Sequence, residues 1–323
     1  MTSSDKAAAD LIPTITQPSR KFSDPQITAD GEARASVSLQ ALNTLWLNTG
    51  TLCNLACESC YIESSPKNDA LVYLSRSEVA EYLDEIVALE LPVKQIGITG
   101  GEPFMNPDLI DIVDDCLSVG HQVLLLTNAM RPMQKCQEQL LGLQKAYPGQ
   151  LELRVSVDHF SQTKHEEERG RRSWEPMRVG LQWLAAKKFN LTIAGRTRWG
   201  ESEQTLRDGY AQLFEDWRLP VDARDPQALT LFPEMDPAAD VPEITTACWG
   251  ILDVDPNDLM CATARMVVKY KGAPAPNVVA CTLLPYAEGF VYDRDLRSSL
   301  APIPLNHTHC AKFCVLGGGS CSG

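Results

Sequence analysis

Short apolar runs alternate with amphipathic stretches along the chain from Leu45 to about residue 240. The apolar runs, such as LWLNTG, QVLLLTN and LELRVSVD, are nearly continuous, and amphipathic segments such as SRSEVAEYLDEIVALEL lie between them. Continuous apolar strands are typical of parallel sheets that are covered by helices. The pattern therefore predicts an α/β fold in which strand and helix alternate about six times.

The expected strands lie at residues 45–50, 95–101, 122–128, 151–158, 191–197 and 228–236, and the expected helices at 75–91, 106–120, 174–188 and 203–217. Ser75 and Glu78 have the spacing of a capping box. Asn106 is expected to cap the next helix, with Pro107 in its first position. An open doubly wound sheet and a full or partial barrel both fit this order. In either fold, the functional residues lie at the carboxyl ends of the strands.

Composition divides the chain into three segments. Residues 1–42 are rich in Ser, Ala, Thr, Asp and Pro and show no sustained periodicity, so we expect a flexible extension. Residues 43–240 form the predicted α/β domain. In residues 241–323 the alternation stops and six cysteines occur, which predicts a small module held together by metal more than by an apolar core.

The charge and the cysteine content narrow the class of protein. The 323 residues include 29 Lys and Arg against 42 Asp and Glu, and the resulting net charge of −13 disfavours a protein that tracks nucleic-acid phosphates. No apolar stretch is long enough for a signal peptide or a membrane span, so we expect a cytoplasmic location. Because thiols stay reduced there, the 11 cysteines favour metal or redox cofactors over disulfides.

Three of the cysteines, Cys53, Cys57 and Cys60, form a CxxxCxxC run after the first expected strand. The spacing fits an incomplete zinc site, part of a disulfide framework, or three ligands of an iron–sulfur cluster. No cysteine or histidine lies between Cys60 and Cys116 to complete a zinc site of the usual kind. Three thiolates on a cluster leave one metal position free, as a catalytic metal requires.

A second motif, GGEP, ends the second expected strand at Gly100, Gly101, Glu102 and Pro103. Glycine lets a ligand approach the backbone closely, and proline fixes the turn. The glycine carbonyl groups and the Glu102 carboxylate are suited to accept hydrogen bonds from an ammonium group. The alternative is an ordinary strand-to-helix turn with an acidic cap.

The cysteine run with Tyr61 directly after it, followed one strand later by GGEP, resembles the radical S-adenosylmethionine (SAM) superfamily across roughly residues 45–240. The resemblance implies a partial (β/α)6 TIM-type barrel in which Cys53, Cys57 and Cys60 ligate a [4Fe–4S] cluster. SAM would chelate the free iron. One electron, from a donor such as flavodoxin or ferredoxin, would cleave it to methionine and a 5′-deoxyadenosyl radical.

The same resemblance implies further SAM contacts at the strand ends. Tyr61 would flank the adenine. The other implied contacts are Gly100, Gly101, Glu102 and Pro103 for the ammonium group, Thr127 and Asn128 for the pocket wall, Ser156 and Asp158 for the ribose, Arg196 or Arg198 for the methionine carboxylate, and Phe232 for the adenine. Ordinary capping or surface pairing is the alternative role for each of them. No residue is assigned to a catalytic step on the substrate.

The cysteine-rich tail resembles the SPASM and twitch modules of radical SAM enzymes, which hold auxiliary [4Fe–4S] clusters. The tail has fewer cysteines than a full SPASM module, so we expect one auxiliary cluster. Its expected ligands are Cys261, Cys281, Cys310 and Cys314, with Cys321 and Cys248 as substitutes or ligands of a second site. His307 and His309 are expected beside it, facing solvent. Zinc is the alternative occupant, because four thiolates also suit zinc.

These features predict a radical SAM enzyme that abstracts hydrogen from a small-molecule or peptide substrate with help from an auxiliary cluster. Two alternatives stay open: a non-catalytic metal-binding or redox-sensing protein on the same scaffold, and an RNA-modifying radical SAM enzyme. The charged run HEEERGRRSW at 165–174 is expected to be a loop that is solvated or binds a charged substrate. Cys116 and Cys136 are expected to be buried neutral thiols.

Overall fold

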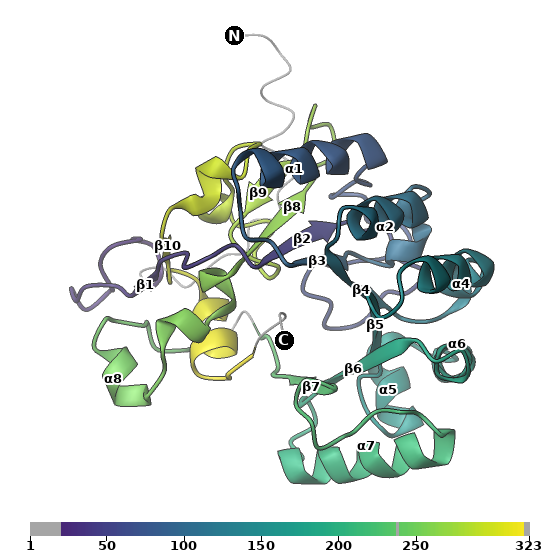
Figure 1. Cartoon of the computed structure of the whole chain (residues 1–323). Helices are drawn as coiled ribbons and strands as arrows, with labels where there is room; N and C mark the ends of the chain where they lie inside the picture. Colours follow the sequence, from purple (N-terminus) through teal and green to yellow (C-terminus); the bar gives the residue numbers. More distant parts are fainter. Residues whose placement is uncertain (1–20, 237–238, 320–323) are drawn as a thin grey trace.

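A computed structural model describes residues 21–236 and 239–319, and its centre is an eight-stranded sheet (Figure 1). The strand order is β7-β6-β5-β4-β3-β2-β8-β9, and only β9 runs antiparallel to its neighbour. The strands are β2 (Thr44–Asn48), β3 (Gln95–Thr99), β4 (Gln122–Thr127), β5 (Leu151–Ser156), β6 (Asn190–Arg196), β7 (Leu229–Phe232), β8 (Ala264–Val268) and β9 (Asn277–Val279). Strands β2 to β7 fall at the six predicted positions, which confirms the α/β class.

Helices line the outer face of this sheet, one after each of several strands (Figure 1). They are α1 (Arg76–Ala88), α2 (Leu109–Ser118), α3 (Arg131–Gln134), α4 (Gln137–Ala146), α5 (Gln162–Arg169), α6 (Trp174–Ala186) and α7 (Glu203–Trp217). The predicted capping box of α1 is present, since Ser75 and Glu78 each accept from the other's backbone amide. The predicted start of α2 is wrong. Asn106 ends a short 3-10 helix, η2 (Pro103–Met105), and α2 begins after Asp108.

The two faces of the sheet pack against different partners. Leu45, Ile96 and Leu125 are fully buried between the sheet and the helices. On the other face, Trp46 packs with Leu124 and with residues of β8. Gly97 on β3 makes room for this indole, because a Cβ at that position would lie 2.4 Å from the Trp46 ring. Large side chains therefore fill this part of the inner face.

The C-terminal segment extends the sheet, which corrects the prediction of a module held mainly by metal. β8 pairs in parallel with β2, and a second apolar cluster packs around Phe290 and Phe313. Burying such side chains stabilises this segment without any metal. Its further elements are α8 (Cys248–Leu252), the 3-10 helices η3 (Pro256–Asp258), η4 (Met260–Ala262), η5 (Glu288–Phe290) and η6 (Arg297–Leu300), strand β10 (Ile303–Pro304) and the π-helix η7 (Cys310–Val315).

Residues 21–42 are packed against this C-terminal segment, so the expected flexible extension is wrong for that part. Strand β1 (Ser36–Val37) pairs with β10, and the buried Arg34 forms an ion pair with Glu243. The Arg34 guanidinium also donates to the carbonyls of Asp24 at 2.6 Å and Ile27 at 3.0 Å. One buried arginine with satisfied donors fixes a segment whose composition alone suggests looseness. Residues 1–20 lie outside the described part of the chain.

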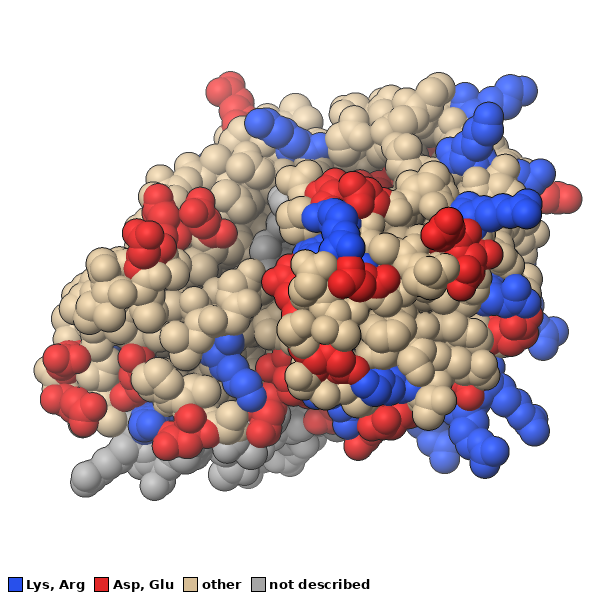
Figure 2. All heavy atoms as spheres, turned by 90° about the horizontal axis from the view of Figure 1, so that it is seen from below, with Lys and Arg blue, Asp and Glu red and all other residues tan. Residues whose placement is uncertain are grey.

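Two global properties bear on function. Within the described ranges, no helix has the length and apolar character that crossing a membrane requires. On the face shown in Figure 2, Lys and Arg side chains are interspersed with Asp and Glu. Neither sign of charge dominates this face, although the whole chain has a net charge of −13.

Candidate cofactor-binding site

A cavity of about 1080 Å³, counting its open mouth, lies at the carboxyl ends of the parallel strands. It collects most of the residues that the sequence singles out. Those lining it are Cys53, Cys57, Cys60, Tyr61, Gly100, Gly101, Pro103, Thr127, Asn128, Ser156, Asp158, Arg196 and Phe232. They come from the ends of β2 to β7, so residues far apart in the chain meet at one site.

The three cysteines lie in the loop after β2, and backbone groups hold two of their sulfur atoms. The amide of Leu55 donates to Cys53 Sγ at 3.4 Å, and the amide of Ser64 donates to Cys60 Sγ at 3.3 Å. Burial raises the pKa of Cys53 to about 12. Burial also raises the pKa of Cys57, against the opposing charge of Arg169. A thiol with a raised pKa needs a metal to become a thiolate at neutral pH. Cys53, Cys57 and Cys60 all line one open cavity, and three thiolates there would suit a cluster with one free position.

The GGEP backbone packs directly on the cysteine loop. Gly101 donates to the Gly50 carbonyl at 2.8 Å, and Glu102 donates from its amide to the Leu52 carbonyl at 3.1 Å. A Cβ on Gly101 would lie 2.3 Å from the Leu52 carbonyl oxygen. Gly100 has a φ of +142°, a conformation that side chains other than glycine rarely adopt. These two positions require glycine because the strand end and the loop touch.

The sequence suggested that the Glu102 carboxylate contacts the ammonium group of a ligand, but Glu102 does not line the cavity. It accepts hydrogen bonds from Thr127 Oγ1 and the Asn128 amide, both at 2.9 Å, and from the Phe104 amide at 3.3 Å. Burial raises its pKa to about 7. Glu102 therefore joins the ends of β3 and β4, and its effect on a ligand is indirect.

Two further polar groups face the cavity at the ends of β5 and α5. Asp158 is buried and forms an ion pair with Arg169, with Nη2 of the arginine 3.2 Å from Oδ1. Burial alone would raise the pKa of Asp158, but Arg169 and Arg196 outweigh it and hold the pKa below its usual value. Arg169 was missed by the sequence analysis, which treated its segment as a loop, although α5 forms there.

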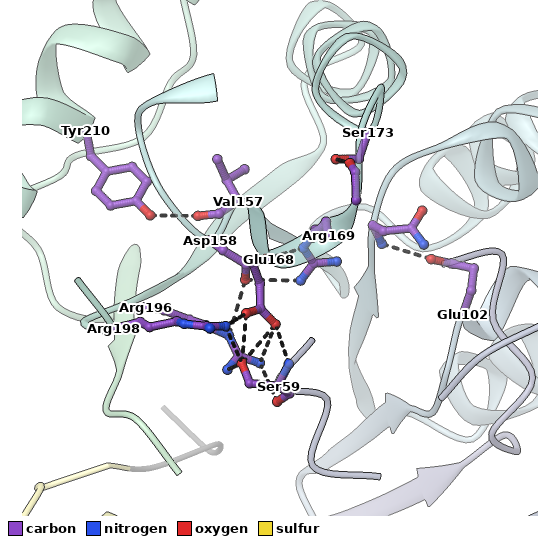
Figure 3. A network of polar contacts seen from close by, with 12 residues as sticks. Ser59, Glu102, Val157, Asp158, Glu168, Arg169, Ser173, Arg196, Arg198 and Tyr210 are labelled. Atoms are coloured by element: carbon purple, nitrogen blue, oxygen red, sulfur yellow. Dashed lines mark hydrogen bonds and ion pairs between the residues drawn. The ribbon is translucent and has the colours of Figure 1, made fainter. Parts of the chain in front are cut away.

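The two arginines after β6 take different positions. Arg196 lines the cavity, and its Nε lies 3.4 Å from Asp158 Oδ1. Arg198 lies outside the lining and pairs with Glu168 and Glu58 (Figure 3). Of the two candidates for a carboxylate contact, only Arg196 is placed at the cavity.

The rest of the wall is apolar and includes side chains from the C-terminal segment. Leu283 and Phe313 line the cavity beside Met235 and Phe232. The rings of Phe232 and Phe313 stack with centroids 5.9 Å apart and an angle of 25°. No local motif marks Leu283 or Phe313 as site residues, because only the tertiary fold brings them to the strand ends.

A second, smaller cavity of about 340 Å³ lies inside the C-terminal segment. Four of the predicted metal ligands line it together with apolar side chains: Cys261, Cys281, Cys310 and Cys314. Burial raises the pKa of Cys261 to about 11 and raises the pKa of Cys310 well above its usual value. No three histidine, cysteine or acidic side chains of residues 21–236 and 239–319 form a group suited to one metal ion.

The remaining tail residues differ from the expectation in part. Cys248 does not line this cavity, and its sulfur accepts from the Thr245 amide at 3.4 Å. Cys321 lies outside the described residues. His307 and His309 are buried and do not face solvent as expected, and burial lowers their pKa values to about 3 and about 4.

Comparison with known proteins identifies the domain that carries the larger cavity. Residues 47–204 match the family model of the radical SAM superfamily. AlbA of Bacillus subtilis, an antilisterial bacteriocin subtilosin biosynthesis protein, is 32% identical over 120 residues, which is 37% of this chain and 25% of AlbA. Mycofactocin maturase MftC of Mycobacterium tuberculosis is 30% identical over 137 residues, 42% of this chain and 33% of MftC.

Solved structures agree on the fold. Streptococcus suis SuiB bound to S-adenosylmethionine matches with a TM-score of 0.57 and 12% identity, covering 79% of this chain and 63% of SuiB. The anSMEcpe structure with bound AdoMet matches with a TM-score of 0.56 and 12% identity, covering 82% of this chain and 83% of that one. These matches confirm the partial-barrel architecture.

Residues 47–204 therefore form a radical SAM domain. The aligned part of the chain spans only 25% and 33% of the lengths of AlbA and MftC.

Proposed function

We propose that this protein cleaves SAM reductively at a [4Fe–4S] cluster held by Cys53, Cys57 and Cys60 and uses the product to abstract hydrogen from a substrate. The observation that supports this best is the larger cavity. It brings the three cysteines, the GGEP backbone and the polar ends of β4 to β6 around one open volume. When bound, the cluster and SAM would supply one-electron cleavage to methionine and a 5′-deoxyadenosyl radical.

The polar side of the cavity would bind and orient SAM. Ser156 and Asp158 line the cavity and would accept hydrogen bonds from the ribose hydroxyl groups, and the carbonyls of Gly100 and Gly101 would accept from the ammonium group. Arg196 and Arg169 present guanidinium groups that suit a carboxylate. The rings of Tyr61 and Phe232, with Pro103, Thr127 and Asn128, would complete the wall around the adenosine and keep water from the reacting bond.

The substrate we propose is a peptide or a small molecule that presents an apolar group to the wall of Met235, Leu283 and Phe313. Relatives support the peptide class: SuiB has been solved bound to the precursor peptide SuiA, and AlbA serves bacteriocin biosynthesis. This step rests on likeness and on the apolar wall, and the small-molecule class stays within the proposal.

The smaller cavity would hold an auxiliary [4Fe–4S] cluster on Cys261, Cys281, Cys310 and Cys314. The four thiols do not form a metal-binding group as they stand, but they line one pocket, and drawn together they would make a closed site that anchors structure or passes electrons. A donor such as flavodoxin or ferredoxin would supply the electrons, and a reducing cytoplasm would keep all these thiols available.

Anaerobic reconstitution with iron and sulfide, followed by dithionite and SAM, tests the proposal. We expect 5′-deoxyadenosine from the reconstituted wild type and none from a variant with Cys53, Cys57 and Cys60 all changed to Ala. Cys136→Ala serves as the control, because this half-buried thiol lines neither cavity. Absence of 5′-deoxyadenosine from the wild type would favour the redox-sensing alternative.

A further inference from the structure

We propose that Glu168 is a positioning residue that fixes the part of the cysteine loop between Cys57 and Cys60. The inference rests on the proposed function only in that this loop would hold the cluster. Glu168 lies on α5, more than a hundred residues along the chain from the cysteine loop, in a charged run that was expected to be a solvated or substrate-binding loop. Figure 3 shows it at the centre of a network that joins the loop to the ends of β5 and β6.

Both residues between Cys57 and Cys60 bond to Glu168 through their backbone. The Glu58 amide donates to the Glu168 carbonyl at 2.9 Å, and the Ser59 amide donates to Glu168 Oε1 at 3.1 Å. The Ser59 hydroxyl lies 2.9 Å from Oε1 and 2.8 Å from Oε2. One residue therefore receives every backbone amide of the segment that separates the two cysteines.

The carboxylate of Glu168 is buried, and arginines balance its charge. Glu168 is 1% exposed, and Arg198 forms an ion pair with it. Arg198 also reaches Glu58 at 3.1 Å, and Arg196 donates to the Ser59 hydroxyl at 2.8 Å. A buried carboxylate that is paired and hydrogen-bonded in this way has one preferred geometry.

Two neighbouring residues of α5 bond to different parts of the site. Glu168 bonds to the cysteine loop, whereas the next residue, Arg169, bonds to Asp158 after β5. The last turn of α5 thereby ties the metal-binding loop to the strand end that faces the cavity. The spacing of Cys57 and Cys60 is set before any metal binds.

Hydrogen exchange of the metal-free full-length chain tests this arrangement directly. We expect Glu168→Ala to raise exchange in the peptide that covers residues 52–63 by about tenfold, because the Ser59 amide and hydroxyl lose their carboxylate acceptor and the Glu58 amide keeps only its bond to the main-chain carbonyl of residue 168. Glu168→Gln keeps an acceptor oxygen and should stay within about threefold of wild type. Glu167→Ala is the matched control, since this neighbour on α5 is exposed.

Iron retention tests the consequence for the cluster. After reconstitution, a ferrous chelator should remove iron from Glu168→Ala about tenfold faster than from wild type, with Ser59→Ala in between. The electron paramagnetic resonance spectrum of the reduced protein should also broaden in Glu168→Ala and recover in Glu168→Gln. A purely structural role elsewhere in the fold would not produce this recovery.

The outcomes separate the inference from the proposed function. If Glu168→Ala exchanges hydrogen and releases iron at the same rates as the wild type, the inference is overturned, even if the wild type cleaves SAM. If the wild type holds no iron on the loop, the proposed function fails, while hydrogen exchange still decides the role of Glu168. If Glu168→Ala does not fold, Ser59→Ala and Glu168→Gln decide the question. The inference is contradicted if hydrogen exchange in Ser59→Ala equals that of the wild type while exchange in Glu168→Gln is much faster than in the wild type.

Discussion

The two thiol-lined cavities of this protein differ in size and in the chemistry of their walls. The larger one has three cysteines, a carboxylate and two arginines, and it opens to solvent at the strand ends. The smaller one has four cysteines among apolar side chains. Three thiolates beside polar groups and free volume leave room for a ligand on the metal, whereas four thiolates in a small apolar pocket close it. This contrast is the basis for proposing SAM chemistry in the first cavity and a supporting role for the second.

The largest expected effect is a difference in SAM cleavage between two single variants, each of which lacks one cysteine of one cavity. We expect Cys57→Ala to bring SAM cleavage below detection, because the cluster loses one of its three ligands. Cys281→Ala should keep cleavage in the absence of substrate within about tenfold of wild type. The yield of 5′-deoxyadenosine under dithionite measures both. Equal loss in the two variants would remove the functional distinction between the cavities.

Arg169→Lys should weaken SAM binding by about tenfold, because lysine keeps the charge but lacks the planar fork that pairs with a carboxylate. Equilibrium binding of SAM to the reconstituted variant measures this. Arg171→Lys, at an exposed position two residues further on, should bind like wild type. Unchanged affinity in Arg169→Lys would mean that Arg169 only supports Asp158.

The pH dependence of stability should have opposite signs in the two regions. The folded-state pKa of Glu102 is raised to about 7, so its folded form holds a proton that the unfolded form releases, and its contribution to stability falls as pH rises from about 4.5 to 7. The pKa of His307 is lowered to about 3, so its contribution falls as pH drops below about 6.5. Each slope is at most about 1.4 kcal/mol per pH unit.

Both slopes can be measured by denaturant unfolding of the metal-free chain between pH 5 and 7, with on the order of one measurement per half pH unit. Relative to wild type, Glu102→Gln should gain stability with rising pH, and His307→Gln should lose less stability on acidification. The same slope in all three proteins would contradict the burial of these groups.

Gly319→Ala tests the smallest expected effect, beside Phe313 in the apolar wall of the larger cavity. A Cβ at Gly319 would lie 2.5 Å from the Phe313 ring, so we expect a loss of about 1–3 kcal/mol in unfolding free energy. Gly142→Ala on α4 meets nothing within 4 Å and should be neutral or stabilising by up to about 1 kcal/mol. Thermal unfolding of the two variants measures the difference. Equal midpoint temperatures would show that the Phe313 ring can move aside without a loss of stability.

Local sequence patterns predicted what depends on local physics. The six strands β2 to β7 were found because buried parallel strands carry continuous apolar runs, and the cysteine loop because its ligands are close in sequence. The role of Glu102 was not predictable, since two of its three donors, at Thr127 and Asn128, belong to the end of the neighbouring strand β4. Arg34 and Glu168 were missed for the same reason: a charged residue in a polar segment looks solvated until its buried partner is known.

In the C-terminal segment, too, long-range contacts could not be predicted from the local sequence. β8 pairs with β2 across more than two hundred residues, and its short apolar run carries no sign of that partner. The four tail cysteines were identified by their chemistry, but their meeting in one apolar cavity depends on packing around Phe290 and Phe313.

The most direct test of the central claim is electron paramagnetic resonance of a Cys261→Ala, Cys310→Ala double variant, reconstituted and reduced, with and without SAM. The variant removes two of the four cysteines that line the smaller cavity and leaves all three of the larger cavity in place. We predict a signal from one reduced [4Fe–4S] cluster whose g-values shift when SAM is added. A signal that SAM does not change would contradict the assignment of this cavity to SAM.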